Sequence, residues 1–144
     1  IERGRRADTA RINQEMRDLM QHGAWVGVFP EGTTGDGREV HKFYSSLLQP
    51  AVELGCPIVP VAIRYTQNGQ YTDVPAYIDG ISLWESLQRI ISETGLVAEL
   101  RFGKPFAPEH HRRELAVHAE AAVAGLLGVD RRASSVTFPE VVND

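Results

Sequence analysis

The chain has 144 residues, of which 42% are apolar and 24% are charged. This composition is typical of an ordered globular chain, and the length suits one domain with a real core but not two. A net charge of −4 argues against non-specific binding of nucleic acid. Cys56 is the only cysteine, which excludes an intrachain disulfide and a thiolate zinc cluster. No apolar run approaches the roughly 18 residues that a membrane-spanning helix needs.

The first half of the chain alternates helical and strand-like patterns. Apolar residues at helical spacing predict a helix over residues 8–22. The nearly continuous apolar run 24–29 predicts a buried parallel strand. The glycine-rich segment 32–39 is expected to be a loop, and a second helix is expected over residues 45–54.

The second half continues the alternation with one irregularity. The run 58–65 is strand-like, but Pro60 cannot donate to a ladder, so we expect an edge position, a bulge, or a strand that starts at Val61. The other expected elements are a long loop over 66–80, a helix over 83–91, a half-exposed strand over 98–102, a helix over 109–127 and a loosely held tail over 129–144. This order predicts an α/β fold with a mainly parallel sheet flanked by helices.

The segment Phe29-Pro30-Glu31-Gly32-Thr33 combines a strand end with a tight turn. In open α/β sheets, ligands bind at the carboxyl ends of the strands. The Glu31 carboxylate could accept hydrogen bonds from substrate hydroxyls or orient a cationic group, or it could simply cap the turn. Thr33 and Thr34 add hydroxyl donors beside glycines that let a ligand approach the backbone.

Few other side chains are candidates for a site. Arg3, in an arginine-rich segment, could hold a phosphate through two parallel hydrogen bonds. His41 follows the glycine-rich loop and is kept as a possible ligand contact. The histidines show no metal-ligand spacing, so no metal is expected.

Two blocks of the sequence resemble the glycerolipid acyltransferases, the 1-acylglycerol-3-phosphate O-acyltransferase family. Residues 29–33 match the family's Phe-Pro-Glu-Gly-Thr block, and Val59, Pro60, Val61, Ala62 and Ile63 match its Val-Pro-Val-Ala-Ile block. Residues 1–3 look like the end of its Ile-x-Arg element, and the segments 83–87 and 102–105 are similar to its downstream course. The likeness covers residues 1–128, which we take as a partial acyltransferase domain followed by a C-terminal tail over 129–144.

The resemblance implies a function and site residues. Arg3, Glu31, Gly32, Thr33 and Thr34 would bind the head group of a lyso-lipid acceptor, and Val59 to Ile63 would support the acyl-binding region. The acyl donor would be acyl-CoA or acyl carrier protein, which is a substrate, and no cofactor is implied. The parent enzyme would lie on the cytoplasmic face of a membrane, as in the bacterial inner membrane, and would bind no nucleic acid.

One family block is missing from the chain. The family carries His-x-x-x-x-Asp upstream, where histidine is the general base on the acceptor hydroxyl and aspartate orients it. None of the five histidines here has an aspartate five positions later. Because an alcohol attacks a thioester poorly until its proton is removed, we expect the chain to be N-terminally truncated and inactive alone, with no catalytic residue of its own.

A second departure concerns the acceptor. Where the family has arginine after the threonine of the Glu-Gly-Thr block, this chain has Thr34. The loss of a positive charge weakens a phosphate site. Lysophosphatidate is the preferred acceptor, and a lyso-ornithine lipid or another acceptor without phosphate stays open. A non-catalytic lipid-binding relative is the alternative of a different class.

Overall fold

The computed structural model describes residues 2–78, 80–109 and 111–131, with side chains from residue 8 onward. The elements in chain order are α1 (Glu2–Gln21), β1 (Glu39–Val40), the 3₁₀ turn η1 (Ser45–Leu48), α2 (Gln49–Leu54), β2 (Val61–Gln67), β3 (Gln70–Tyr71), α3 (Leu83–Ser92), β4 (Leu96–Phe102), α4 (Arg112–Leu127) and β5 (Asp130–Arg131). The four predicted helices are therefore present. Arg3 lies in α1, but its side chain and residues 132–144 of the predicted tail lie outside the described part.

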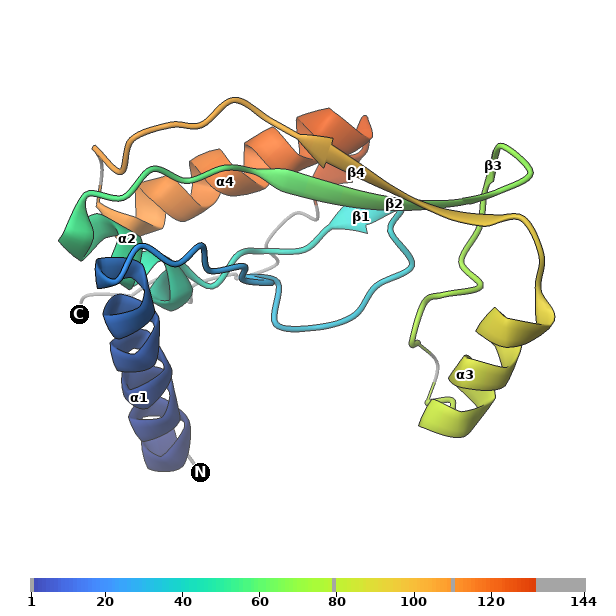
Figure 1. The fold of residues 1–144 in the computed structure, drawn as a ribbon, viewed down its shortest axis with the longest axis horizontal. Helices are drawn as coiled ribbons and strands as arrows, with labels where there is room; N and C mark the ends of the chain where they lie inside the picture. The colour runs from blue at the N-terminus through green and yellow to red at the C-terminus, as the bar shows by residue number, and fades with distance from the viewer. Residues whose placement is uncertain (1, 79, 110, 132–144) are drawn as a thin grey trace, which may run out of the picture.

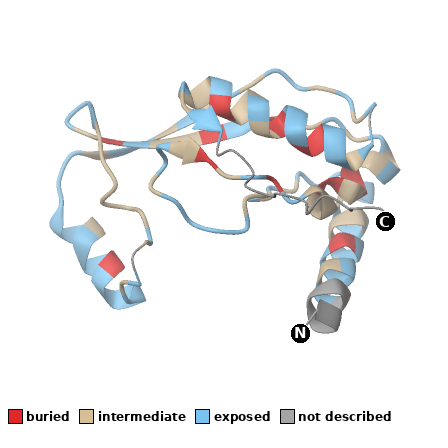
Figure 2. Cartoon of the chain, turned by 180° about the vertical axis from the view of Figure 1, so that it is seen from behind, coloured by how far each residue is buried: buried red, intermediate tan, exposed pale blue. Residues whose placement is uncertain are grey.

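The core lies between α4 and the segments β1 to α2 (Figure 2). Leu115 on α4 is fully buried, and Val40, Phe43 and Leu48 pack with it. Two polar contacts join the same elements: the Phe43 N–H donates to Glu120 Oε2 at 3.1 Å, and Arg112 Nη1 donates to Gln49 Oε1 at 3.1 Å. The packing of α4 thereby fixes where the chain between β1 and α2 runs.

The sheet is not mainly parallel, which corrects the prediction. β2 pairs antiparallel with both β3 and β4, in the order β3-β2-β4, and of the strands that the structure describes only the short pair β1–β5 is parallel. The first reason is the two-residue turn Asn68-Gly69, where both residues have positive φ, a geometry that makes a tight hairpin. The second is that α3 does not pack on the sheet as a crossover helix, so the chain returns antiparallel.

Only one face of the antiparallel sheet is covered in the described part of the chain. Ala62 on β2 is 1% exposed, and α4 packs against β2 and β4. The strand register places Val61 opposite Phe102 and Ile63 opposite Leu100, with their side chains on the other face. Phe102 and Leu100 are exposed there, so this face presents an apolar surface to solvent. Pro60 directly precedes β2, which confirms that the strand starts at Val61.

The apolar run 24–29 does not form the predicted buried strand. No described strand pairs with it, and Trp25 and Phe29 are 90% and 79% exposed. Val28, between them, packs partly against the core. This alternation of exposed and partly buried side chains is that of an extended segment with one side against the protein. A parallel strand would also need hydrogen-bonded neighbours, which the described residues do not provide.

Helix α3 stands apart from the rest of the protein, at the opposite end from α1 (Figure 1). Its N-terminus has a capping box: the Glu85 N–H donates to Ser82 Oγ, and the Ser82 N–H donates to Glu85 Oε2. These hydrogen bonds lower the pKa of Glu85, chiefly that from the Ser82 backbone. Local capping therefore defines this helix where packing contributes little. None of the described helices is long and apolar enough to cross a membrane.

Candidate lipid head-group site

The segment Phe29–Gly32 forms the predicted tight turn. The Gly32 N–H donates to the Phe29 carbonyl at 3.2 Å, with Pro30 and Glu31 at the two central positions. Proline suits the first of these positions because its φ is already fixed. Gly32 has φ +61°, which a residue with a Cβ adopts only at a cost. The turn therefore fixes the backbone on both sides of Glu31.

The Glu31 carboxylate ties this turn to the chain that follows β1. The His41 N–H donates to Glu31 Oε2 at 3.0 Å, and the Tyr44 N–H donates to the Pro30 carbonyl at 2.8 Å. Glu31 thus lies beside the carboxyl end of β1, and its bond closes the loop over residues 31–41. One carboxylate oxygen is used by the fold, while no hydrogen bond is formed by Oε1 among the described residues.

Two aromatic rings lie against glycines of this loop. A Cβ at Gly32 would come within 2.9 Å of Tyr44 Cε2, and one at Gly35 would come within 3.0 Å of His41 Nε2. Glycine at these positions lets the rings lie directly on the backbone. The loop consequently carries an exposed tyrosine and a partly buried imidazole beside Glu31.

The far side of the loop is held by the segment that follows β2. Thr34 Oγ1 donates to the Tyr77 carbonyl at 2.6 Å, and the Tyr71 hydroxyl donates to the Asp36 carbonyl at 2.5 Å. The Arg38 guanidinium lies 5.2 Å from the centre of the Tyr71 ring. The neighbouring Tyr71 side chain and then Asp36 raise the pKa of Arg38, so it stays charged.

The described loop therefore offers hydroxyls, one free carboxylate oxygen and mixed charge. Glu31 and Asp36 are acids, and Arg38 is a base 3.7 Å from Asp36 Oδ2. Such a set can bind the hydroxyls and amines of a polar head group. General base catalysis needs a positioned base, and the imidazole that lies against this loop, His41, has no aspartate five positions later.

The predicted site residues fall into three groups. Glu31, Gly32, Thr33 and Thr34 lie together in the loop, and the Thr33 hydroxyl makes only a long 3.5 Å contact with the Thr34 carbonyl. Residues 59–63 enter β2, where the Pro60 carbonyl accepts from the Gly103 N–H at 2.8 Å. The side chain of Arg3 lies outside the described residues, so its relation to the loop stays a prediction.

Sequence reasoning did not find the aromatic partners Tyr44, Tyr71 and Tyr77. They lie outside both matched blocks, and Tyr77 is 43 residues from its partner Thr34. The sequence indicates only that tyrosines occur in polar segments near glycines, and this pattern does not predict which residues they contact. The three-dimensional arrangement is what adds them to the site.

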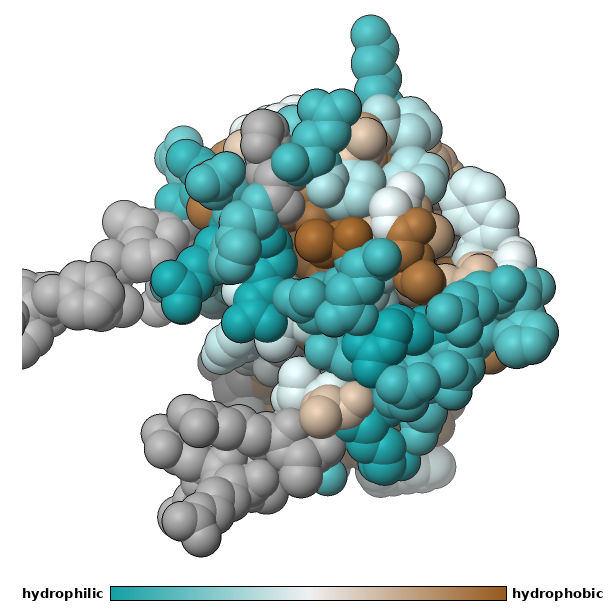
Figure 3. Space-filling view, turned by 90° about the vertical axis from the view of Figure 1, so that its left-hand side faces the viewer, coloured by the Kyte–Doolittle hydropathy of each residue, from teal (hydrophilic) through white to brown (hydrophobic). Residues whose placement is uncertain are grey.

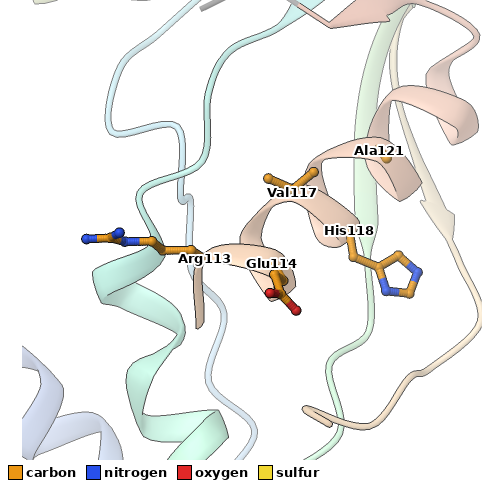
Figure 4. A pocket seen from close by; sticks show the side chains of 5 residues that line it. All are labelled: Arg113, Glu114, Val117, His118 and Ala121. Atoms are coloured by element: carbon orange, nitrogen blue, oxygen red, sulfur yellow. The ribbon is translucent and has the colours of Figure 1, made fainter. Parts of the chain in front are cut away.

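A surface hollow of about 510 Å³ lies elsewhere, along α4 (Figure 4). Residues of this one helix line it: Arg113, Glu114, Val117, His118 and Ala121. The His118 ring stacks on Phe106 with ring centres 4.3 Å apart, so it serves packing. Among the described residues, no group of three or more histidines, cysteines or acids could hold a metal ion.

Comparison with known proteins agrees with the two sequence blocks. The sequence model of the Acyltransferase family matches residues 1–64. A 1-acyl-sn-glycerol-3-phosphate acyltransferase of Neisseria gonorrhoeae is 34% identical over 71% of this chain and 40% of its own length. Lyso-ornithine lipid O-acyltransferases of Pseudomonas aeruginosa and Brucella abortus are 33% and 30% identical, over 81% and 88% of this chain and 45% and 53% of theirs.

No solved structure matches the chain. The chain spans about half the length, or less, of the curated relatives it matches. The family match nevertheless covers the Phe-Pro-Glu-Gly-Thr turn and the Val-Pro-Val-Ala-Ile block together, and relatives of both acceptor types align beyond it. On these findings the chain belongs to the acyltransferase family.

Proposed function

We propose that this chain is the acceptor-binding part of an enzyme that moves a fatty acyl group from a thioester donor to the hydroxyl of a lyso-lipid. The observation that carries the proposal is the Glu31 turn, whose carboxylate accepts the His41 N–H through Oε2, while Oε1 has no hydrogen bond within the described part of the chain. Residues 31–34 would contact the head group. The donor would be acyl-CoA or acyl carrier protein, and the enzyme would work on the cytoplasmic face of a membrane.

The proposal includes a catalytic pair supplied from outside these 144 residues. None of the histidines precedes an aspartate at the family spacing. Two exposed apolar surfaces support a missing layer of protein: the uncovered sheet face with Leu100 and Phe102, and the extended segment with Trp25 and Phe29. An antiparallel sheet can leave one face to water when that face is polar, but this face is apolar, so further polypeptide would both cover it and bring the base.

The loop's charges bear on the choice of acceptor. Lysophosphatidate is the first candidate because of the matched blocks and the relatives named for that reaction. A zwitterionic acceptor such as a lyso-ornithine lipid is the second, and a specific observation favours it. Thr34 supplies no cation and its hydroxyl donates to the Tyr77 carbonyl, while Glu31 and Asp36 outnumber Arg38 in the loop. An amine-bearing head group would be attracted by this balance.

The test is an acyl-transfer assay with both acceptors. The chain alone should give no transfer from labelled acyl-CoA or acyl carrier protein. The protein with an upstream segment that carries His-x-x-x-x-Asp should transfer, and Thr34→Arg in it should shift preference toward lysophosphatidate. Gly27→Ala, a change where a Cβ meets no atom within 4 Å, serves as the matched control. Turnover by the chain alone would refute the missing pair, and acceptor binding without turnover by the extended protein would indicate the non-catalytic relative.

A further inference from the structure

Helix α3 carries a one-sided set of large apolar side chains that face solvent. Leu83, Trp84, Leu87 and Ile91 are 76%, 64%, 45% and 68% exposed. At about 100° of rotation per residue, these four lie within an arc of roughly 100°. The polar residues Glu85, Gln88, Arg89 and Ser92 occupy a separate arc, so the helix is amphipathic with its apolar side outward.

The covered side of α3 is a different one. Ser86 is buried and Ile90 is half-buried, and on the helical wheel they lie next to the exposed arc rather than within it. No described helix or strand packs extensively on α3, which lies at the end of the molecule away from α1 (Figure 1). The end that carries α1 and α2 has a mostly hydrophilic surface with a small hydrophobic group (Figure 3). The exposed apolar arc of α3 therefore lies at the opposite end of the molecule from this small hydrophobic group.

The size of the arc argues for a lipid surface over a separate partner protein as its occupant. Its four side chains expose roughly 500 Å², at about 200 Å² for a fully exposed large apolar side chain. A stable protein interface buries about 800 Å² on each partner. A lipid surface has no such threshold, because each apolar side chain that enters the acyl boundary adds to binding separately.

The residue types of α3 also fit a lipid surface, and its charges bear on which lipids would bind. Trp84 has the amphipathic ring that favours the boundary between head groups and acyl chains, and Tyr77 is exposed in the preceding loop. The helix carries one acid and one base, Glu85 and Arg89, and Arg89 lies 3.9 Å from Asp73. Because these charges balance, α3 gains no electrostatic attraction to anionic lipid, so its membrane binding would come from burial of the apolar side chains.

We propose that α3 is a membrane-interfacial helix that lies in the bilayer surface with Leu83, Trp84, Leu87 and Ile91 among the lipids. This inference rests on the proposed function in one respect, that the acceptor is a lipid in a bilayer. The inference goes further by assigning the membrane contact to α3 and by predicting that membrane binding is insensitive to salt. The acceptor loop at Thr34 is connected to this region through Tyr77, so the helix would hold the loop near the membrane surface.

The experiment uses the whole chain and vesicles of pure phosphatidylcholine, which contain neither acceptor nor donor. The chain has two tryptophans, Trp25 and Trp84, and both are exposed. Trp25→Phe leaves Trp84 as the only reporter, and its emission should shift to the blue with vesicles and be quenched by brominated lipid. Trp84→Phe leaves Trp25, which should show neither change. The bound fraction should stay constant between about 0.05 and 0.5 M salt.

A pair of variants tests the arc directly. Leu83→Ser combined with Ile91→Ser should weaken vesicle binding about tenfold or more, because two apolar side chains leave the lipid. Leu19→Ser, at an exposed leucine of α1, is the matched control and should change binding less than about twofold. Absence of a Trp84 shift, an equal shift of Trp25, or full binding by the double variant would each overturn the inference. A failed acyl-transfer assay would leave these measurements unaffected, so the two proposals fail separately.

Discussion

Replacement of Glu31 by alanine should destabilise the folded chain because it removes one hydrogen bond. Glu31 Oε2 accepts the His41 N–H at 3.0 Å in a partly buried position. A hydrogen bond to a charged group contributes about 1.5–3 kcal/mol, and the N–H left without its partner adds a desolvation cost. We expect the free energy of unfolding to fall by about 2 kcal/mol, which corresponds to a decrease of about 4–8 °C in Tm for a chain of this size.

The assay is urea unfolding followed by circular dichroism, with hydrogen exchange of the His41 amide as a local probe. Glu31→Gln keeps a carbonyl oxygen in the same place, so it should cost about 1 kcal/mol or less. Glu109→Ala removes an exposed acid outside the loop and should stay within about 0.5 kcal/mol of the parent. An alanine variant that unfolds like the parent, with unchanged protection of the His41 amide, would refute the role of this bond.

Three further changes test the turn, the core and the cap of α3. Gly32→Ala should cost about 1–2 kcal/mol because of its positive φ and the close Tyr44 ring, whereas Gly27→Ala should be nearly neutral; thermal unfolding compares the two. Leu115→Ala should cost about 2–4 kcal/mol in urea unfolding because it empties a fully buried site, and Val117→Ala on the exposed side of α4 should cost far less. Hydrogen bonds from Ser82 lower the pKa of Glu85, so the cap's contribution is present above the ordinary glutamate value, about 4.3, and is lost as pH falls through the lower folded value. The protection factor of the Ser82 amide, which removes the intrinsic pH dependence of exchange, should therefore fall when the pH is lowered below the folded pKa of Glu85. Equal protection factors at neutral pH and in acid would contradict the capping box.

Local patterns predicted the four helices and the strands β2 and β4 because the signals of these elements are local, whereas the strand over 24–29 is absent and the predicted loop 66–80 contains the β2–β3 hairpin. The helix periods, the stop at Gly55 and the start of β2 after Pro60 each depend on residues within one or two turns of the chain. Whether neighbouring strands run parallel or antiparallel does not depend on nearby residues alone. Alternation of helices and strands implies a parallel sheet only when the helices pack on the sheet as crossovers. The Asn68-Gly69 turn was a readable hairpin signal, and it argues for the antiparallel arrangement that the structure shows.

The site was predictable only in its backbone. The Phe-Pro-Glu-Gly-Thr sequence requires a tight turn, and the turn is present with Gly32 at positive φ. The partners of its side chains come from distant positions: His41 for Glu31 and Tyr77 for Thr34. No period or spacing encodes such pairs. Likewise, an apolar run identifies residues that avoid water, but it does not identify what covers them, which is why 24–29 was wrongly predicted as a buried strand.

The two variants of Glu31 also separate a structural role from a binding role. Oε2 receives the His41 N–H, and Oε1 makes no hydrogen bond among the described residues, so one side chain can fix the loop and contact a ligand at once. Glutamine preserves an acceptor for the His41 N–H but removes the negative charge that a head-group amine would need. In the extended, active protein, Glu31→Gln should therefore raise KM for a zwitterionic acceptor more than for lysophosphatidate while the fold stays stable. Equal effects of glutamine and alanine on stability and on both acceptors would mean that Glu31 acts through the loop alone.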